Sequence, residues 1–381
     1  MWSIWDWFQA LSGESKTLLI TLGGLLIKWI WDRRLIYRLK NEIIRKEVEI
    51  EKREAELSGA KHEVDILQQK LNRLFEALRK QNDAGLWTTF APNPPNGLKV
   101  PASDRRPKIL TVANNKGGVG KTTVVGNLLA YFDRKKSLRV LAIDLDYQGS
   151  LSTLLRAERV SLGQRRSSVN DLLEYGATQS ALLTATRGLG ARLSRSELVQ
   201  AFYELVSLED RLMIEWLLQE NSGNDVRYRL ASVLLQPEIA QRYDLVLIDV
   251  PPRLSAGTIN ALCCSTHVLV PTIFNPIAAE PVENFLVAAK RMMSTMNPSL
   301  QYAGVLETLA PSTGVNKAAR AEGRRIVEEA IARSFPEISI LKTSVPQAVS
   351  IARGGVAYLN DVRARRHFDA LGNEISERLG L

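Results

Sequence analysis

The sequence predicts an α/β protein in which helices flank a mostly parallel sheet, preceded by an apolar N-terminal segment and a long helix. Short apolar runs, such as 109–113 and 140–143, alternate with segments of helical periodicity. A glycine-rich loop follows the first of these runs, and a proline-free heptad repeat fills 34–82. We therefore expect an apolar membrane segment at 1–33, a coiled coil at 34–82, a proline-rich linker at 83–107 and a folded domain at 108–381.

The composition excludes several classes of protein. The chain has 381 residues, of which 45% are hydrophobic and 24% charged, so it is not wholly disordered. Its two cysteines, Cys263 and Cys264, are adjacent, and it has three histidines. This set excludes a disulfide framework and argues against a Cys/His zinc site.

The N-terminal segment has the character of a membrane anchor. Residues 17–31 read TLLITLGGLLIKWIW, with Lys28 as the one charge. The run is shorter than the about 20 residues that usually span a bilayer, but Lys28 could reach the interface and tryptophans flank the run. No small-residue cleavage site follows, so a secretory signal is disfavoured, and the basic residues after 32 predict a cytoplasmic remainder. An interfacial or partner-buried helix is the first alternative, and an ordinary core helix the second.

The segment 34–82 carries a sustained heptad repeat. With Ile36 as the first a position, the a positions are Ile36, Ile43, Ile50, Leu57, Val64, Leu71 and Leu78. The d positions are apolar near both ends but include Lys46 and Arg53 in the middle. This pattern predicts a left-handed, parallel two-stranded coiled coil that makes a homodimer. The alternative is one amphipathic helix that lies on its own domain.

The loop after the first predicted strand has the composition of a phosphate-binding site. It reads NNKGGVGKTT, between a strand at 109–113 and a helix at 122–132. Its glycines let backbone amides turn toward an anion, and the helix start adds the positive end of its dipole. Lys121 can reach the β- and γ-phosphates, and Thr122 can ligate magnesium. The strict pattern GxxxxGK[ST] fails at Asn115. The expected cofactor-binding residues of the loop are Gly117, Gly118, Val119, Gly120, Lys121, Thr122 and Thr123.

Aspartates end two further predicted strands. Asp144 and Asp146 follow the strand 140–143, and Asp249 ends the apolar run before two prolines. Ligand-binding residues of open α/β sheets collect at the carboxyl ends of the strands, so we expect all three carboxylates beside the phosphates. Asp249 is expected to hold magnesium through water.

The run KGGVGKT, in which Lys116 precedes the glycines, resembles the deviant Walker A box of the ParA/MinD family of P-loop ATPases. The resemblance implies a P-loop NTPase fold, with ATP and Mg²⁺ as cofactors and slow hydrolysis. Lys116 would then reach across an ATP-sandwiched dimer to the nucleotide of the other subunit. The run DLDYQ resembles the family's DxDPQ signature, with Tyr147 in place of proline, which implies that Asp146 positions the attacking water and that Asp144 lies on the metal side.

Two more stretches support the resemblance, which covers about 107–360. The run LVLID resembles Walker B and implies that Asp249 is a metal-site residue, with Thr122 and Asp144 as the others. The run SILKTSVPQ resembles the late strand near the adenine, so Pro346 and Gln347 are candidate contacts. The stretch 156–242 is mostly helical by pattern and has no assigned chemistry.

Three functional hypotheses follow. The leading one is a membrane-tethered, ATP-dependent dimeric switch at the bacterial inner membrane, with its ATPase domain in the cytoplasm, that positions or recruits a protein or DNA. A polysaccharide-export tyrosine kinase is disfavoured, because Tyr358 is the one tyrosine near the C-terminus. An ATP-binding scaffold of a multi-protein complex, such as a defence complex, with little turnover is the third. Non-specific DNA is a further candidate partner because the net charge is +9 and two basic clusters are present: Arg320, Arg324, Arg325 and Arg363, Arg365, Arg366.

Overall fold

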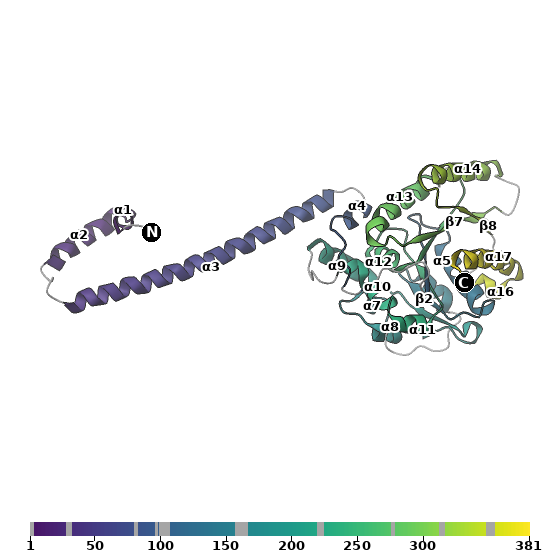
Figure 1. Cartoon of the computed structure of the whole chain (residues 1–381), viewed down its shortest axis with the longest axis horizontal. Coiled ribbons are helices and arrows are strands. Elements are labelled where there is room, and N and C mark those ends of the chain that lie inside the picture. The colour runs from purple at the N-terminus through teal and green to yellow at the C-terminus, as the bar shows by residue number, and fades with distance from the viewer. Residues whose placement is uncertain are drawn as a thin grey trace. The chain divides into compact units, whose positions relative to one another are not determined.

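The computed structural model describes a defined part of the chain, which divides into two compact units, Met1–Asn72 and Arg73–Leu381 (Figure 1). Each unit is described here by itself. The described residues are 4–27, 33–79, 83–95, 98, 107–156, 167–218, 225–275, 279–311, 317–347 and 355–381.

The first unit is helical. Helix α1 (Ile4–Gln9) and helix α2 (Gly13–Ile27) are separated at Ser12. Large apolar side chains of both helices are exposed, Ile4 and Ile20 among them. None of the helices in the described ranges is both long enough and apolar enough to cross a bilayer. The structure thus does not support the expected transmembrane span, and part of the predicted run, 28–31, lies outside the described residues.

Helix α3 (Arg33–Arg79) covers almost the whole predicted heptad segment. Its side chains at Ile43, Ile50, Leu57, Val64 and Leu71 are between 49% and 59% exposed. These are consecutive a positions of the repeat, so a row of apolar side chains lies open to solvent along one face of the helix. Ion pairs one turn apart, such as Arg53 with Glu49, lie along the same helix.

The second unit is built on an eight-stranded sheet in the order β3-β4-β2-β5-β1-β6-β7-β8. Seven of these strands run parallel to their neighbours, and β3 is antiparallel to β4. The prediction of a mostly parallel sheet is therefore confirmed. The strands are β1 Lys108–Val112, β2 Val140–Asp144, β3 Thr186–Gly188, β4 Ser196–Val199, β5 Leu245–Asp249, β6 His267–Thr272, β7 Gln301–Ala310 and β8 Ile340–Pro346.

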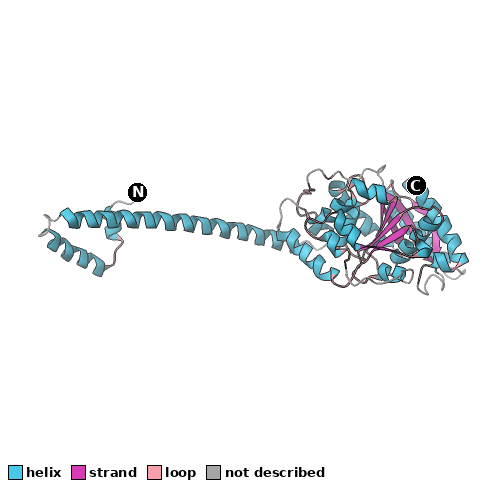
Figure 2. Ribbon diagram, turned by 90° about the horizontal axis from the view of Figure 1, so that it is seen from below, coloured by secondary structure: helices cyan, strands magenta, loops and turns pink. Residues whose placement is uncertain are grey.

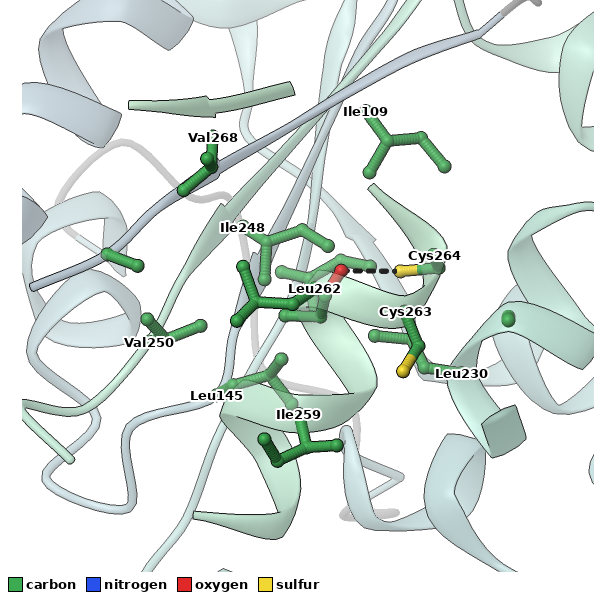
Figure 3. Packing of buried hydrophobic residues seen from close by; sticks show 14 of the residues in the cluster. Ile109, Leu145, Leu230, Ile248, Val250, Ile259, Leu262, Cys263, Cys264 and Val268 are labelled. Carbon is green, nitrogen blue, oxygen red and sulfur yellow. Dashed lines mark hydrogen bonds between the residues drawn. The ribbon is translucent and has the colours of Figure 1, made fainter. Parts of the chain in front are cut away.

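Helices cover both faces of the sheet (Figure 2). Successive residues of one strand point to opposite faces, so Ile109 joins one buried cluster and Leu110 the other. One face is covered by α5 (Lys121–Arg134), α6 (Ser150–Arg156), α16 (Ala357–Asn360) and α17 (Val362–Leu379). The other face is covered by α9 (Leu205–Leu218), α10 (Arg229–Leu234), α12 (Ala256–Cys264) and α13 (Ala279–Met296). Figure 3 shows Ile248 of the sheet beside Leu262 of α12.

The secondary structure of the stretch 156–242 differs in part from the mostly helical prediction. Its described part contains the expected helices, but β3 and β4 also lie there and extend the sheet beyond β2. Both strands are short, and neither has a clear period of two, so the hydrophobic pattern gave no signal for them. The remaining elements of the unit are α7 Asn170–Leu173, α8 Gln179–Ala185, η1 Ala191–Leu193, η2 Val226–Tyr228, α11 Pro237–Arg242 and α14 Lys317–Ser334.

Part of the expected linker belongs to the folded unit. Helix α4 (Asp83–Trp87) carries Trp87, which is fully buried in the core, and Phe90 packs against the same core. The boundary predicted at residue 107 is therefore wrong for 83–95. The prolines that follow indicate a linker, but the aromatic residues before them find apolar partners that only the fold supplies.

Candidate functional site

The glycine-rich loop connects β1 to α5 at the carboxyl edge of the sheet. Gly118 and Gly120 have φ values of 72° and 82°, a left-handed backbone that favours glycine. Thr308 at the end of β7 supports the loop, because its Oγ1 donates to the Val119 carbonyl at 2.8 Å. Asn114 fixes the loop start, since its Oδ1 accepts from Lys116 N at 3.0 Å. The loop is thus preformed, as a phosphate cradle must be.

The Lys121 ammonium lies inside this loop. Its Nζ donates to the carbonyl oxygens of Asn114 at 3.3 Å and of Lys116 at 3.2 Å. Burial lowers the pKa of Lys121, while the nearby carboxylates of Asp249 and Asp146 raise it. A buried ammonium whose hydrogen bonds go to neutral carbonyls gains from an anion, so the geometry is compatible with the predicted role of Lys121 in phosphate binding.

Thr122 and Asp249 meet at the floor of the site. The Thr122 Oγ1 donates to Asp249 Oδ2 at 2.7 Å. Asp249 Oδ1 is buried and has no hydrogen-bond partner within the described part of the chain. Burial and the adjacent Asp144 raise the pKa of Asp249 well above its usual value. An unpaired, buried carboxylate oxygen beside a hydroxyl is a ligand set of the kind that Mg²⁺ prefers, so these residues fit the metal.

Asp144 pairs in register with Asp249 across β2 and β5. Its Oδ2 accepts from Ser152 N at 2.8 Å and from Ser152 Oγ at 2.7 Å, and its Oδ1 accepts from Asp146 N at 3.1 Å. Burial raises the pKa of Asp144 to about 6. Both carboxylate oxygens are therefore occupied by protein donors. These bonds fix the loop 145–149 and the start of α6, a role that the sequence did not reveal.

Asp146 and Lys116 lie at the open side of the site. Asp146 lines the cavity and accepts from Gln148 N at 3.0 Å. Lys116 is partly exposed, and no hydrogen bond or ion pair of its ammonium occurs among the described residues. Tyr147, which replaces the expected proline, packs edge-on against Tyr203 at 6.2 Å between ring centroids.

Most of the predicted residues line one cavity of about 490 Å³, whereas Lys116, Asp144 and Asp249 are not part of its lining. Pro346 and Gln347, the candidate adenine contacts, line it together with the loop, and Gln347 N donates to Ala310 O at 2.8 Å. A second cavity of about 510 Å³ lies beside α13 and contains the Lys290–Glu337 ion pair, and the predicted site residues are not part of its lining. The lining residues of the first cavity that sequence analysis missed are Val124, Ser150, Pro252, Thr308, Leu309 and Val345.

The first basic cluster is largely neutralised by carboxylates. Arg320 pairs with the buried Glu307, and Arg324 pairs with Glu328 on the same helix. Arg325 lies between two glutamates of α14, Glu322 and Glu329. In the second cluster, Arg365 donates to the Tyr358 carbonyl at 3.1 Å, while Arg363 and Arg366 are exposed. The charge that remains for a polyanion is smaller than the sequence implies.

Comparisons with known proteins agree with this geometry. Residues 107–302 match a family model described as an AAA domain. The chromosome-partitioning ATPase Soj of Thermus thermophilus is 35% identical over 202 residues, which are 52% of this chain and 68% of that protein. The sporulation initiation inhibitor protein Soj of Bacillus subtilis is 29% identical over 266 residues, 68% of this chain and 93% of that protein. The fold is also similar to a solved structure of cobyrinic acid a,c-diamide synthase from Mycobacterium smegmatis, which contains an ATP analogue and magnesium. The TM-score is 0.54 at 25% sequence identity, and the match covers 70% of this chain and 92% of that chain.

Proposed function

The chain belongs to the ParA/MinD-type P-loop ATPases, and on that premise we propose that it is a membrane-attached, ATP-dependent dimeric switch that positions or recruits a partner. It is an ATP hydrolase that uses ATP and Mg²⁺. The observation that carries the switch is the Lys116 ammonium, which has no partner in the described residues although the loop around it is otherwise fixed.

The residues of the site take separate roles in this proposal. The loop amides and Lys121 bind the phosphates, and Asp146 orients the attacking water. Thr122 and Asp249 would hold Mg²⁺, which neutralises phosphate charge. Asp144 acts mainly through the loop that carries Asp146, since its oxygens already accept protein hydrogen bonds.

Two interfaces would make the dimer. The exposed seam of α3, which includes Ile50 and Leu57, supports a parallel coiled coil, because an apolar heptad face needs a second copy to be buried. The ATP sandwich would add a second contact through Lys116. The coiled coil would hold two ATPase domains at a high effective concentration, so ATP would change the contact between domains that are already tethered.

The N-terminal helices support attachment to the inner membrane. Five large apolar side chains are more than half exposed: Ile4, Trp5, Trp7, Leu18 and Ile20. In most proteins, lipid or a partner protein covers an apolar surface of this kind. Because α2 is short, we favour insertion at the interface over a span. The ATPase domain would then face the cytoplasm.

The partner is proposed as an unidentified protein, with DNA as the second candidate. Two of the relatives are named for chromosome partitioning and for sporulation control. DNA binding would rest on Arg363, Arg365 and Arg366, which are exposed on α17 and stand outside the ion pairs of α14. A scaffold role with little turnover is the alternative, and a steady-state ATPase assay separates it from the switch.

The switch is tested by light scattering on residues 83–381, which retain the buried α4. With Asp146→Ala to slow hydrolysis, ATP should convert this fragment from monomer to dimer. Lys116→Ala should remove that dimer, whereas Lys136→Ala, an exposed lysine after α5, should not. A fragment that is dimeric without ATP would refute the proposal.

A further inference from the structure

We propose that residues 83–95, here called the strap, couple helix α3 to the nucleotide site, so that strap docking and ATP binding strengthen each other. The inference rests on the nucleotide site proposed above. It assigns a role to a region that the sequence left as a linker and to the helix α9 within the stretch 156–242.

The strap is anchored first by its aromatic residues. Trp87 is fully buried, and its Nε1 donates to the Leu254 carbonyl at 2.8 Å. Its ring stacks on Trp216 of α9 with 6.0 Å between centroids, and Phe90 meets the same Trp216 edge-on at 4.9 Å. Trp216 is therefore the central contact between the strap and the domain.

The second anchor is Arg227, a fully buried guanidinium. Its Nη1 donates to the carbonyls of Trp87 at 2.9 Å and Phe90 at 3.2 Å, and its Nη2 donates to Ala91 O at 3.0 Å. Asp225 pairs with it at 2.6 Å and also accepts from Asn93 N at 3.1 Å. If the strap left, a buried charge would lose three acceptors, which is unfavourable, so the docked strap is a defined state.

The docked strap contacts the loop that carries one lining residue of the nucleotide site. Leu254, whose carbonyl Trp87 holds, lies in the loop that follows Asp249 at the end of β5. Pro252 of that loop lines the nucleotide cavity. A movement of Trp87 would therefore shift the loop between Asp249 and α12, in which Pro252 lines the nucleotide cavity.

A second connection runs through α9. Glu209 lies two turns before Trp216 on this helix; it accepts from Gly257 N at 3.1 Å and pairs with Arg253 at 2.6 Å. The Arg253 guanidinium lies 5.7 Å from the centroid of the Tyr147 ring, next to Asp146 in the chain. Helix α9 thus contacts the strap through Trp216 and the loop after Asp249 through Glu209, and Arg253 extends this connection to Tyr147.

The chain itself links the strap to the coiled coil, because residues 80–82 join α3 to α4. Any nucleotide-dependent shift of the Leu254 loop would act on the strap, and thermodynamic linkage requires the reverse effect to be equal. Trp87 and Glu209 are positioning residues in this account. Neither is expected to touch the nucleotide.

The spectroscopic test uses the full chain with Trp2, Trp5, Trp7, Trp29 and Trp31 replaced by phenylalanine. Emission then reports Trp87 and Trp216 alone. Titration with ATP and Mg²⁺ should change this emission saturably, and Lys121→Ala should abolish the change. Emission that stays constant while ATP binds normally would overturn the inference.

The energetic test compares a strap variant with a buried control variant on the opposite face of the sheet. Trp87→Phe leaves the Leu254 carbonyl without its donor and should weaken ATP binding by about 2- to 10-fold, the range of one neutral hydrogen bond. Ile375→Val, a buried change on α17 at the opposite face, should leave ATP affinity unchanged. Glu209→Gln combined with Trp87→Phe should lose less than the sum of the two single losses.

Equal effects of Trp87→Phe and Ile375→Val on ATP affinity would refute the coupling. Neither readout measures the oligomeric state directly. If ATP fails to dimerise residues 83–381 while the emission still responds, the switch is wrong and the coupling stands. If ATP dimerises residues 83–381 but the emission does not respond, the coupling is wrong and the switch stands.

Discussion

The Thr122 hydroxyl donates to one oxygen of Asp249 at 2.7 Å, and the other oxygen of the same carboxylate has no partner in the described residues. This contact joins the first turn of α5 to the end of β5. It brings two of the three expected metal-site residues together and leaves buried negative charge only partly compensated. The properties of the site follow from that imbalance.

The first prediction concerns Lys121. Lys121→Ala removes the ammonium from the phosphate cradle, and loss of a charge-assisted hydrogen bond should weaken ATP binding by about 10- to 100-fold. A fluorescent ATP analogue titrated into the protein measures the change. Lys136→Ala serves as the control, because this lysine is exposed and lies outside the cavity. If Lys121→Ala binds ATP with the affinity of the parent protein, the assignment of the nucleotide site is wrong.

The second prediction is a pH dependence of magnesium binding. Burial and Asp144 raise the pKa of Asp249, so the carboxyl holds a proton below that raised pKa and binds metal poorly there. The Mg²⁺ concentration needed for half-maximal ATP binding should therefore fall as pH rises through that raised pKa and then become constant. Asp144→Asn removes a negative neighbour and should move the transition to lower pH. A midpoint that is independent of pH contradicts this role of Asp249.

The third prediction tests whether the strap belongs to the domain. Trp87→Ala should lower the free energy of unfolding of residues 83–381 by about 3–5 kcal/mol, the usual cost of a large core truncation. Tyr175→Ala is the matched control, since Tyr175 is 63% exposed and its loss should cost less than about 0.5 kcal/mol. Denaturant unfolding measures both. If Trp87→Ala and Tyr175→Ala have equal free energies of unfolding, the strap is a linker and not part of the folded domain.

The fourth prediction concerns the seam of α3. Ile50→Lys with Leu57→Lys puts charge at two successive a positions, each of which contributes about 1.5–3 kcal/mol per chain when buried. A protein that starts at residue 34 should then become monomeric by sedimentation at concentrations where the parent is a dimer. Ala55→Lys, at the outer f position, should leave the dimer intact. A monomeric parent would refute the coiled coil.

The fifth prediction concerns the N-terminal helices. The full chain should float with anionic lipid vesicles through a high-salt wash, because attachment would rest on buried apolar area. Leu18→Asp with Ile20→Asp should abolish flotation, while Lys16→Gln should preserve it. Release of the parent by salt alone would indicate electrostatic attachment instead.

The local signals of the sequence were sufficient for the nucleotide loop. Gly118, Gly120, Lys121 and Thr122 are neighbours in the chain, and their chemistry depends on a strand and a helix that directly flank them. Asp249 was also predictable, because a parallel strand delivers its last residue to the same edge of the sheet as the loop. The heptad repeat of α3 likewise follows from spacing alone.

The tertiary structure decided what lies far apart in the chain. Thr308 supports the loop across 189 positions, and Arg227 reaches the strap carbonyl of Trp87 across 140. The same holds for Asp144, whose Oδ2 accepts two hydrogen bonds from Ser152 at the start of α6. The sequence determined the chemistry that neighbouring residues create through backbone geometry and periodicity. Only the fold decided which buried charges and carbonyls find partners, because each such partner depends on how separate elements pack.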